Sequence, residues 1–234
     1  PGSDYHTTVA LRSGPGAVGI ERFPNQVQDL LAFIADDMPP GHPFAGIHAQ
    51  PRGSSIPEPW LLGSSDGSAS LAAYFGTPFS FAHFITDEGG PEVMRAYRQH
   101  FRPSRWRDSP EGSIGVAVTC AETWEEASRL ALSRDLSRLR RDQGRLGPVP
   151  SVEEAEAYPY TAEERAHIAH NRKRQVIGDP GEAKAQLLEL GKIYEVDEFV
   201  VVTITYDFAA RLRSYELLAA AFGLTPRQRV SDSS

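Results

Sequence analysis

Residues 59–84 read PWLLGSSDGSASLAAYFGTPFSFAHF, and the fold is inferred from this stretch outward. It opens with the apolar run Trp60-Leu61-Leu62, which is short enough to be a strand buried on both faces. The run stops at Gly63, and residues 69–75 favour a helix before a second apolar run from Phe79 to Ile85. The order strand, turn, helix, strand predicts two parallel strands joined by a right-handed crossover.

The turn between the first strand and the helix is built from small residues. They are Gly63, Ser64, Ser65, Gly67 and Ser68. Amide groups in the first turn of a helix have no partner within the helix, and the helix dipole adds partial positive charge there. Small residues let an anion approach that backbone closely, and hydroxyls add donors, so the turn favours a phosphate site. The alternative is that Ser64 or Ser65 only caps the helix.

Composition narrows the class of protein. The chain has 234 residues, 40% hydrophobic and 24% charged, and its length suits one α/β domain over residues 1–234. The net charge of −7 argues against nucleic-acid or anionic-membrane partners, and no apolar segment approaches the roughly 20 residues of a membrane span. Cys120 is the only cysteine and lies in an apolar run, which predicts a buried thiol and a cytoplasmic location.

Four segments read as principal buried strands, each followed by a helix. They lie near residues 59–63, 77–84, 113–120 and 198–205, with a shorter strand-like run at 174–178 and a helix over 20–38 before the first strand. Residues 144–172 are interpreted as a helical excursion before the last strand-helix units. Four strand-helix units amount to half of a TIM (β/α)8-type barrel, whose usual size is about 250 residues.

Two groups of charged residues allow both a functional and a plain interpretation. The first contains five arginines: Arg134, Arg138, Arg140, Arg141 and Arg145. We interpret it as a solvated helix face, because no aromatic residues are interleaved as nucleic-acid binding would require. The second group, Glu164, His167 and His170, has the spacing of half a metal site. No matching second motif completes it, so no metal site is predicted.

Three motifs together resemble the bacterial luciferase-like monooxygenases, which are flavin-dependent oxidoreductases with a (β/α)8 barrel. The motifs are WLLGSSDGSASLAAYFGTPFSFAHF, RQVIGDPGEA and DEFVVVTITYDFAARLRSYELLAAAFG. The resemblance covers nearly the whole chain and implies that this chain supplies roughly strands 5–8 of the barrel with their helices. It also implies a cofactor, flavin mononucleotide (FMN), used in its reduced form with dioxygen to oxidise an organic substrate such as an aldehyde.

The resemblance assigns roles to particular residues. The phosphate loop of the family follows the fifth strand, which corresponds here to Ser64, Ser65 and Ser68 after Gly63. Trp60 and Leu62 would then lie beneath or beside the isoalloxazine ring. The remaining candidates, for the upper rim of the barrel, are Tyr5, His83 and Arg174. His83 is the one candidate catalytic residue, although a rim histidine hydrogen-bonded to a neighbour is an equally good interpretation.

The sequence also departs from the family pattern. The phosphate-binding arginine of the family would fall just before Pro1, and its catalytic histidine belongs to the second strand, so neither is present. The opening Pro1-Gly2-Ser3-Asp4 is typical of a processed, trimmed or partial chain. Half a barrel leaves two strand edges and an apolar inner face uncovered, so we expect a homodimer or pairing with the missing barrel half.

The leading hypothesis is therefore an FMN-dependent monooxygenase acting on a small organic substrate, with a separate flavin reductase as partner. Whether deazaflavin replaces FMN stays open. The alternative is a non-catalytic flavin-binding protein or truncated-barrel dimer. A third possibility, a phosphate-binding aldolase or isomerase, is disfavoured because no predicted strand carries the lysine that a Schiff base needs.

Overall fold

The structure, a computed structural model, describes residues 20–53 and 55–225. The helices are η1 (Ile20–Arg22, a 3-10 turn), α2 (Phe23–Ala35), α3 (Asp66–Phe75), α4 (Gly90–His100), α5 (Trp124–Asp142), α6 (Val152–Ala157), α7 (Ala162–Arg172), α8 (Pro180–Tyr194) and α9 (Phe208–Ala221). The strands are β1 (Leu61–Gly63), β2 (Phe79–Phe81), β3 (Gly112–Cys120), β4 (Gln175–Gly178) and β5 (Glu198–Val202). No helix within the described ranges is long and apolar enough to cross a membrane.

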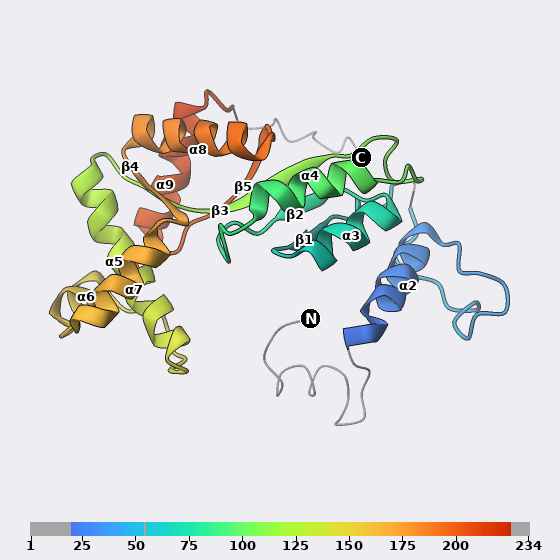
Figure 1. Cartoon of the computed structure of the whole chain (residues 1–234), viewed down its shortest axis with the longest axis horizontal. Coiled ribbons are helices and arrows are strands. Elements are labelled where there is room, and N and C mark those ends of the chain that lie inside the picture. Colours follow the sequence, from blue (N-terminus) through green and yellow to red (C-terminus); the bar gives the residue numbers. More distant parts are fainter. Residues whose placement is uncertain (1–19, 54, 226–234) are drawn as a thin grey trace, which may run out of the picture.

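The five strands form one sheet in which every described pairing is parallel (Figure 1). β1 pairs with β2, and β2 pairs with residues 112–114 of β3. β5 pairs with residues 113–117 of β3 and β4 with residues 117–120. The β3 residues that pair with β5 overlap those that pair with β2 and those that pair with β4. β5 therefore lies along one edge of β3, and β2 and β4 lie along the other edge. The sheet thus runs β1-β2-β3-β4, and β5 pairs with β3 outside this path.

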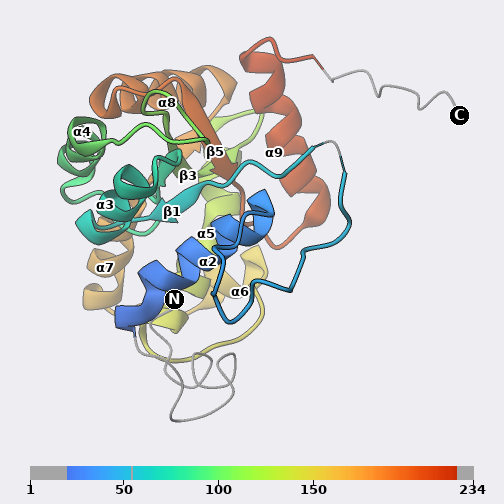
Figure 2. The same ribbon diagram turned by 90° about the vertical axis from the view of Figure 1, so that its right-hand side faces the viewer.

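The helices that follow these strands form a continuous outer layer. α3 contacts α4, α4 contacts α8, and α8 contacts α9. Figure 2 shows these four helices following one another in an arc around the strands. The main core lies between this arc and the sheet, where it includes Phe79, Phe81, Met94 and Tyr97. The predicted buried thiol, Cys120, belongs to the same core and is 1% exposed.

The opposite face of the sheet is open at both edge strands. Leu62 on β1 is 59% exposed, and Val200 on β5 is 53% exposed. The prediction that residues 60–62 form a strand buried on both faces was therefore wrong for β1. The apolar run is real, but β1 pairs only with β2 among the described strands, and only its Leu61 side packs on the core. The same holds for β5, which also ends at Val202, three residues earlier than expected.

The long helix after β3 does not join the arc. α5 packs against α6, α7 and β4, and a second, smaller core joins Leu136, Leu139 and Ala155. In Figure 1 these three helices stand together beyond the carboxyl ends of the strands. α8, which contacts β3 and β4, occupies the position in the arc between α4 and α9. α5, α6 and α7 thus pack together as one helical block.

Candidate functional site

The turn after β1 places a helix start at the carboxyl edge of the sheet. β1 ends at Gly63, Ser65 is the N-cap residue, and α3 begins at Asp66, three residues earlier than the sequence pattern indicated. Gly67 and Ser68 therefore lie in the first turn. Ser65 has an extended backbone (φ −142°, ψ 160°), yet its side chain makes no capping hydrogen bond. The plain interpretation, a serine whose hydroxyl caps α3, is not what the structure has for Ser65.

The hydroxyls of this turn instead point toward each other. The Oγ atoms of Ser65 and Ser68 lie 3.3 Å apart, and the position is exposed. Gly63 is required for this arrangement, because a Cβ atom at that residue would overlap the Oγ and Cβ of Ser68. The half-buried Ser64 lies between them in the chain. Backbone amides of a first turn, two converging hydroxyls and no competing cap fit the requirements of a phosphate group.

The two candidate ring contacts precede this turn. Trp60 is half-buried, and Leu62, two residues on, lies on β1 and exposes its side chain. Trp60 immediately precedes β1, and Leu62 lies within it on the open side of the sheet. This geometry provides an apolar surface next to the phosphate candidate, which is what a flat aromatic ring would contact.

His83 lies two residues beyond β2 and is committed to a structural contact. It is 4% exposed, and its Nδ1 lies 2.9 Å from the hydroxyl of Tyr194 at the end of α8. Burial lowers the pKa of His83, Asp87 acts to raise it and Arg174 lowers it further. Burial also raises the pKa of Tyr194 to about 12, so the tyrosine stays a neutral partner. The geometry is that of a hydrogen-bonded rim histidine, and a catalytic role stays a prediction.

The last two candidates lie apart from the serine turn. The guanidinium of Arg174, half-buried just before β4, donates to the carbonyl of Ile85 after β2 and to Oδ1 of Asn171. Arg174 and His83 are therefore electrostatic neighbours, with His83 beyond the carboxyl end of β2 and Arg174 just before the amino end of β4. Tyr5 lies outside the described residues. The structure thus groups Gly63, Ser65 and Ser68 in one place and His83 with Arg174 in another.

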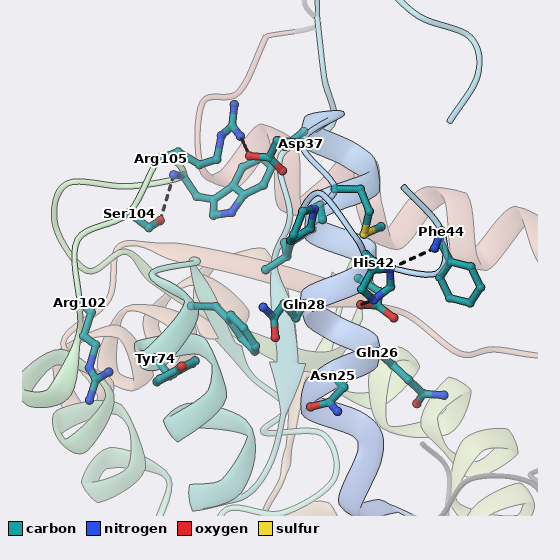
Figure 3. A pocket seen from close by; sticks show the side chains of 18 of the residues that line it. Asn25, Gln26, Gln28, Asp37, His42, Phe44, Tyr74, Arg102, Ser104 and Arg105 are labelled. Atoms are coloured by element: carbon teal, nitrogen blue, oxygen red, sulfur yellow. Dashed lines mark hydrogen bonds and ion pairs between the residues drawn. The ribbon is translucent and has the colours of Figure 1, made fainter. Parts of the chain in front are cut away.

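A large cavity lies at the amino ends of the strands, on the opposite side of the sheet from the serine turn. It has a volume of about 1160 Å³ and is lined by α2, the end of α3 and the loop 102–106 that leads toward β3. Figure 3 shows Tyr74 and Arg102 on the α3 side, with Asn25 and Gln26 coming from α2. None of the predicted site residues lines it. The amino edge of a parallel sheet is where this class of fold places stability rather than chemistry.

Two of the three residues with metal-like spacing are engaged in other contacts. Glu164 completes the capping box of α7 by accepting from the amide of Thr161, and His167 Nε2 lies 2.8 Å from Asp142. Across the described part of the chain, no group of three or more His, Cys, Asp or Glu side chains could hold a metal ion.

Comparison with known proteins identifies the family. No protein-family model matches the chain. It is 45% identical over 222 residues to the uncharacterised protein YceB of Bacillus subtilis, covering 95% of this chain and 67% of that protein. It is 29% identical over 219 residues to a luciferase-like monooxygenase of Escherichia coli K12, covering 93% of this chain and 63% of that protein.

Comparison with solved structures identifies the same family. The crystal structure of apo-MsnO8 superposes with a TM-score of 0.82 at 33% identity, covering 96% of this chain and 67% of that one. The chain thus spans about two thirds of the length of the proteins it matches. Its parallel α/β sheet agrees with the fold of these relatives. The chain belongs to the luciferase-like monooxygenase family.

Proposed function

We propose that the protein is a flavin-dependent monooxygenase that uses reduced FMN and dioxygen to oxidise a small organic substrate. The observation that carries this proposal is the uncapped start of α3, where the hydroxyls of Ser65 and Ser68 converge without serving the helix. Family membership supports the reaction class, and the turn supports the form of the cofactor, because an uncapped helix start with two hydroxyls favours a phosphorylated flavin.

In this proposal the chain binds and orients the cofactor. Ser64, Ser65 and Ser68 with the first amides of α3 hold the phosphate, and Gly63 leaves the space in which Ser68 can turn toward it. Trp60 and Leu62 support the ring on the open face of the sheet. FMN, reduced by a separate flavin reductase, supplies the redox chemistry with dioxygen. Exclusion of water from the ring requires that the open face be covered, by a second copy or by further barrel strands.

The test compares FMN with riboflavin, which lacks only the phosphate. Both flavins are titrated into the purified full-length protein, reduced and oxidised, and the ratio of their dissociation constants is measured. Each charge-assisted hydrogen bond contributes about 1.5–3 kcal/mol, so loss of the two hydroxyls in Ser65→Ala/Ser68→Ala should reduce the preference for FMN by roughly 100-fold or more. Ser70→Ala, an exposed serine on the same helix, is the control and should leave the ratio unchanged. A wild-type protein that binds both flavins equally would contradict the phosphate assignment.

One observation favours the non-catalytic alternative, namely that the inner face of the sheet is open at Leu62 and Val200. An uncovered face would leave bound flavin in contact with water. The products formed when the protein loaded with reduced FMN meets dioxygen and an aldehyde separate the two functions. A monooxygenase forms carboxylic acid and water in proportion to the reduced FMN consumed, whereas on a flavin carrier the reduced FMN reacts with dioxygen to give hydrogen peroxide and leaves the aldehyde unchanged.

A further inference from the structure

Arg102 places free hydrogen-bond donors in the cavity between α2 and the loop 102–106. Its guanidinium lies over the ring of Tyr74, 4.9 Å from the ring centroid, and both residues line the cavity (Figure 3). Within the described residues, the side chain of Arg102 makes this stacking contact and no hydrogen bond or ion pair. The ring covers one face of the guanidinium and leaves the N–H groups along its edges open. A guanidinium presented in this way suits a phosphate or carboxylate, which it binds through two parallel hydrogen bonds.

The loop that carries Arg102 is fixed to the end of α3. The amide of Arg102 donates to the carbonyl of Ala73 at 2.9 Å. The hydroxyl of Ser104 donates to the carbonyl of Gly76 at 2.8 Å and accepts from the amide of Trp106 at 3.0 Å. Gly76 has a φ of +63°, and a Cβ atom there would overlap the carbonyl of Arg102 and the side chain of Ser104. This wall of the cavity is therefore held in place by the protein's own hydrogen bonds, as a binding site requires.

The acidic side chains that line the cavity already have partners. Asp37 pairs with Arg105, and this ion pair links the segment after α2 to the loop. Oδ1 of Asp29 lies 3.4 Å from Nε2 of His42. Neither aspartate pairs with Arg102, so within the described residues its charge is not compensated, although the whole chain has a net charge of −7. The loop side of the cavity therefore favours an anion.

The opposite wall, on α2, carries carboxamides. Asn25 and Gln28 line the cavity, and in Figure 3 they extend from α2 toward α3, whereas Gln26 points away. Asn25 and Gln28 are three residues apart and therefore share one face of the helix. Neither side chain hydrogen-bonds another described residue. A carboxamide offers a donor and an acceptor side by side, which match the amino group and the ring nitrogen on one edge of adenine.

The size and the aromatic lining of the cavity fit a ligand with a planar ring. Its volume of about 1160 Å³ slightly exceeds the roughly 300–1,000 Å³ of typical small-molecule sites. Tyr74, which is 57% exposed, Phe75 and the half-buried Trp106 give the loop side an aromatic surface. An aromatic surface next to a free guanidinium suits a ligand that carries both a flat ring and an anionic group.

We propose that this cavity is a second ligand site, which binds an adenine nucleotide. Arg102 holds the phosphate, and the carboxamides of Asn25 and Gln28 recognise the edge of the base across the cavity. The bound nucleotide connects α2 to the loop 102–106, which the ion pair between Asp37 and Arg105 already joins. The site lies at the amino ends of the strands, so it binds a ligand without taking part in the flavin chemistry. It does not depend on the proposed function.

The test uses AMP as the probe and measures its binding by calorimetry at constant ionic strength. AMP is titrated into the full-length protein and into its Ser65→Ala/Ser68→Ala variant, which should bind AMP equally well. Arg102→Met should weaken AMP binding by roughly tenfold or more, in line with the loss of a charge-assisted hydrogen bond. Arg102→Lys, which keeps the charge without the planar fork, should restore part of it. Arg165→Met removes an arginine that lies over Tyr160 in the same way, outside the cavity, and should have no effect.

Recognition of the base is tested separately with ribose 5-phosphate, which lacks adenine. Gln28→Leu, which removes the carboxamide, should weaken AMP binding roughly fivefold, as expected for a neutral hydrogen bond, and leave ribose 5-phosphate binding unchanged. The wild-type protein should bind AMP more tightly than ribose 5-phosphate. Equal affinity for the two compounds overturns the assignment to a nucleotide.

Three further outcomes overturn the site itself. They are absence of AMP binding by the wild-type protein, AMP binding unaffected by Arg102→Met, and loss of AMP binding in Ser65→Ala/Ser68→Ala with Arg102 intact. The last result would place the phosphate of AMP at the serine turn. Failure of the proposed function is seen separately, as absence of FMN binding by the wild-type protein, and Arg102→Met should leave FMN binding unchanged.

Discussion

The starts of α3 and α8 contrast two uses of the same kind of sequence. At α8, Asp179 accepts from the amides of Gly181 and Glu182 at 2.8 and 2.9 Å, and Glu182 accepts in return from the amide of Asp179. At α3, Ser65 is equally able to cap, has the same extended backbone, and makes no such bond. Both turns follow strands of one parallel sheet. The difference is that side chains cap the first amides of α8, whereas at α3 the amide of Ser68 donates to the carbonyl of Ser65 and the hydroxyl of Ser65 caps no amide.

α7 strengthens the contrast. Its Thr161 and Glu164 form a second complete capping box, and Thr123 caps α5 through its hydroxyl. Arg22 and Gly89, the N-cap residues of α2 and α4, have no side-chain hydrogen-bond acceptor. These two helix starts therefore cannot be compared with the start of α3. Ser65 is therefore distinctive among the described helix starts, as a capable capping residue whose hydroxyl does not cap.

Gly63→Ala should damage both folding and binding. The added Cβ would overlap Ser68, which sits against the end of β1, so the serine or the strand must move. Overpacking of this kind costs about 1–3 kcal/mol, and the FMN preference over riboflavin should fall with it. Urea unfolding and the two flavin titrations measure these effects. Gly147→Ala, where a Cβ meets nothing within 4 Å, is the control. If this variant kept the wild-type preference for FMN over riboflavin, the result would contradict a contact between Ser68 and the phosphate.

Asp179→Ala should affect stability alone. Loss of a capping carboxylate that serves two amides is expected to cost about 1–2 kcal/mol of unfolding free energy. The ratio of FMN to riboflavin affinity should not change, because this cap serves only the helix. Asp108→Ala, an exposed aspartate in the loop before β3, is the matched control for charge. A changed ratio of FMN to riboflavin affinity would contradict the view that the start of α3, and not the start of α8, binds the phosphate.

His83→Gln should change how stability depends on pH. The pKa of His83 is lowered from 6.5 in the folded protein, so the unfolded chain takes up a proton first as the pH falls. Wild-type stability should therefore decline below pH 6.5, by at most about 1.4 kcal/mol per pH unit, until the folded pKa is reached. The glutamine variant should lose this component, as measured by urea unfolding from pH 7 to 5. An identical pH profile in both proteins would mean that His83 is not held neutral by the fold.

Ser65→Ala should have the smallest effect on stability and a large effect on binding. Because the hydroxyl makes no capping bond, the loss of unfolding free energy should stay below about 0.5 kcal/mol, against about 1 kcal/mol for an ordinary cap. Thr161→Ala at α7 provides that ordinary cap for comparison. A loss as large as that of Thr161→Ala would show that Ser65 caps α3 in solution, and the argument for a free helix start would fail.

Local sequence patterns were sufficient to predict the elements around the serine turn. The run ending at Leu62, the small residues of the turn and the run from Phe79 correspond to β1, the start of α3 and β2. These features depend on short-range preferences and on periodicity, which the sequence displays directly. The parallel pairing also follows, because a helix between two strands leaves no other connection.

Features set by long-range contacts were beyond that kind of reasoning. Leu62 is apolar, but its exposure depends on what covers the other face of the sheet. Arg134 looked like its surface neighbours in the sequence, yet it is buried, on a helix that packs against β3, β4, α6 and α7. A charged residue gives no local signal of whether a partner from another segment will pair with it. Ser65 likewise reads as a cap in sequence, since the orientation of its hydroxyl is not encoded in the motif.

The shared edge of β3 has a mechanical consequence. α5 begins four residues after β3 ends. After α7 the chain returns to the sheet as β4, which pairs with residues 117–120 of β3. The block of α5, α6 and α7 is therefore anchored to β3 at both ends, directly at its start and through β4 at its end. An outward rotation of the block would turn about residues 121–123 and 173–174, the short connections at its two ends, and would break its packing against β4.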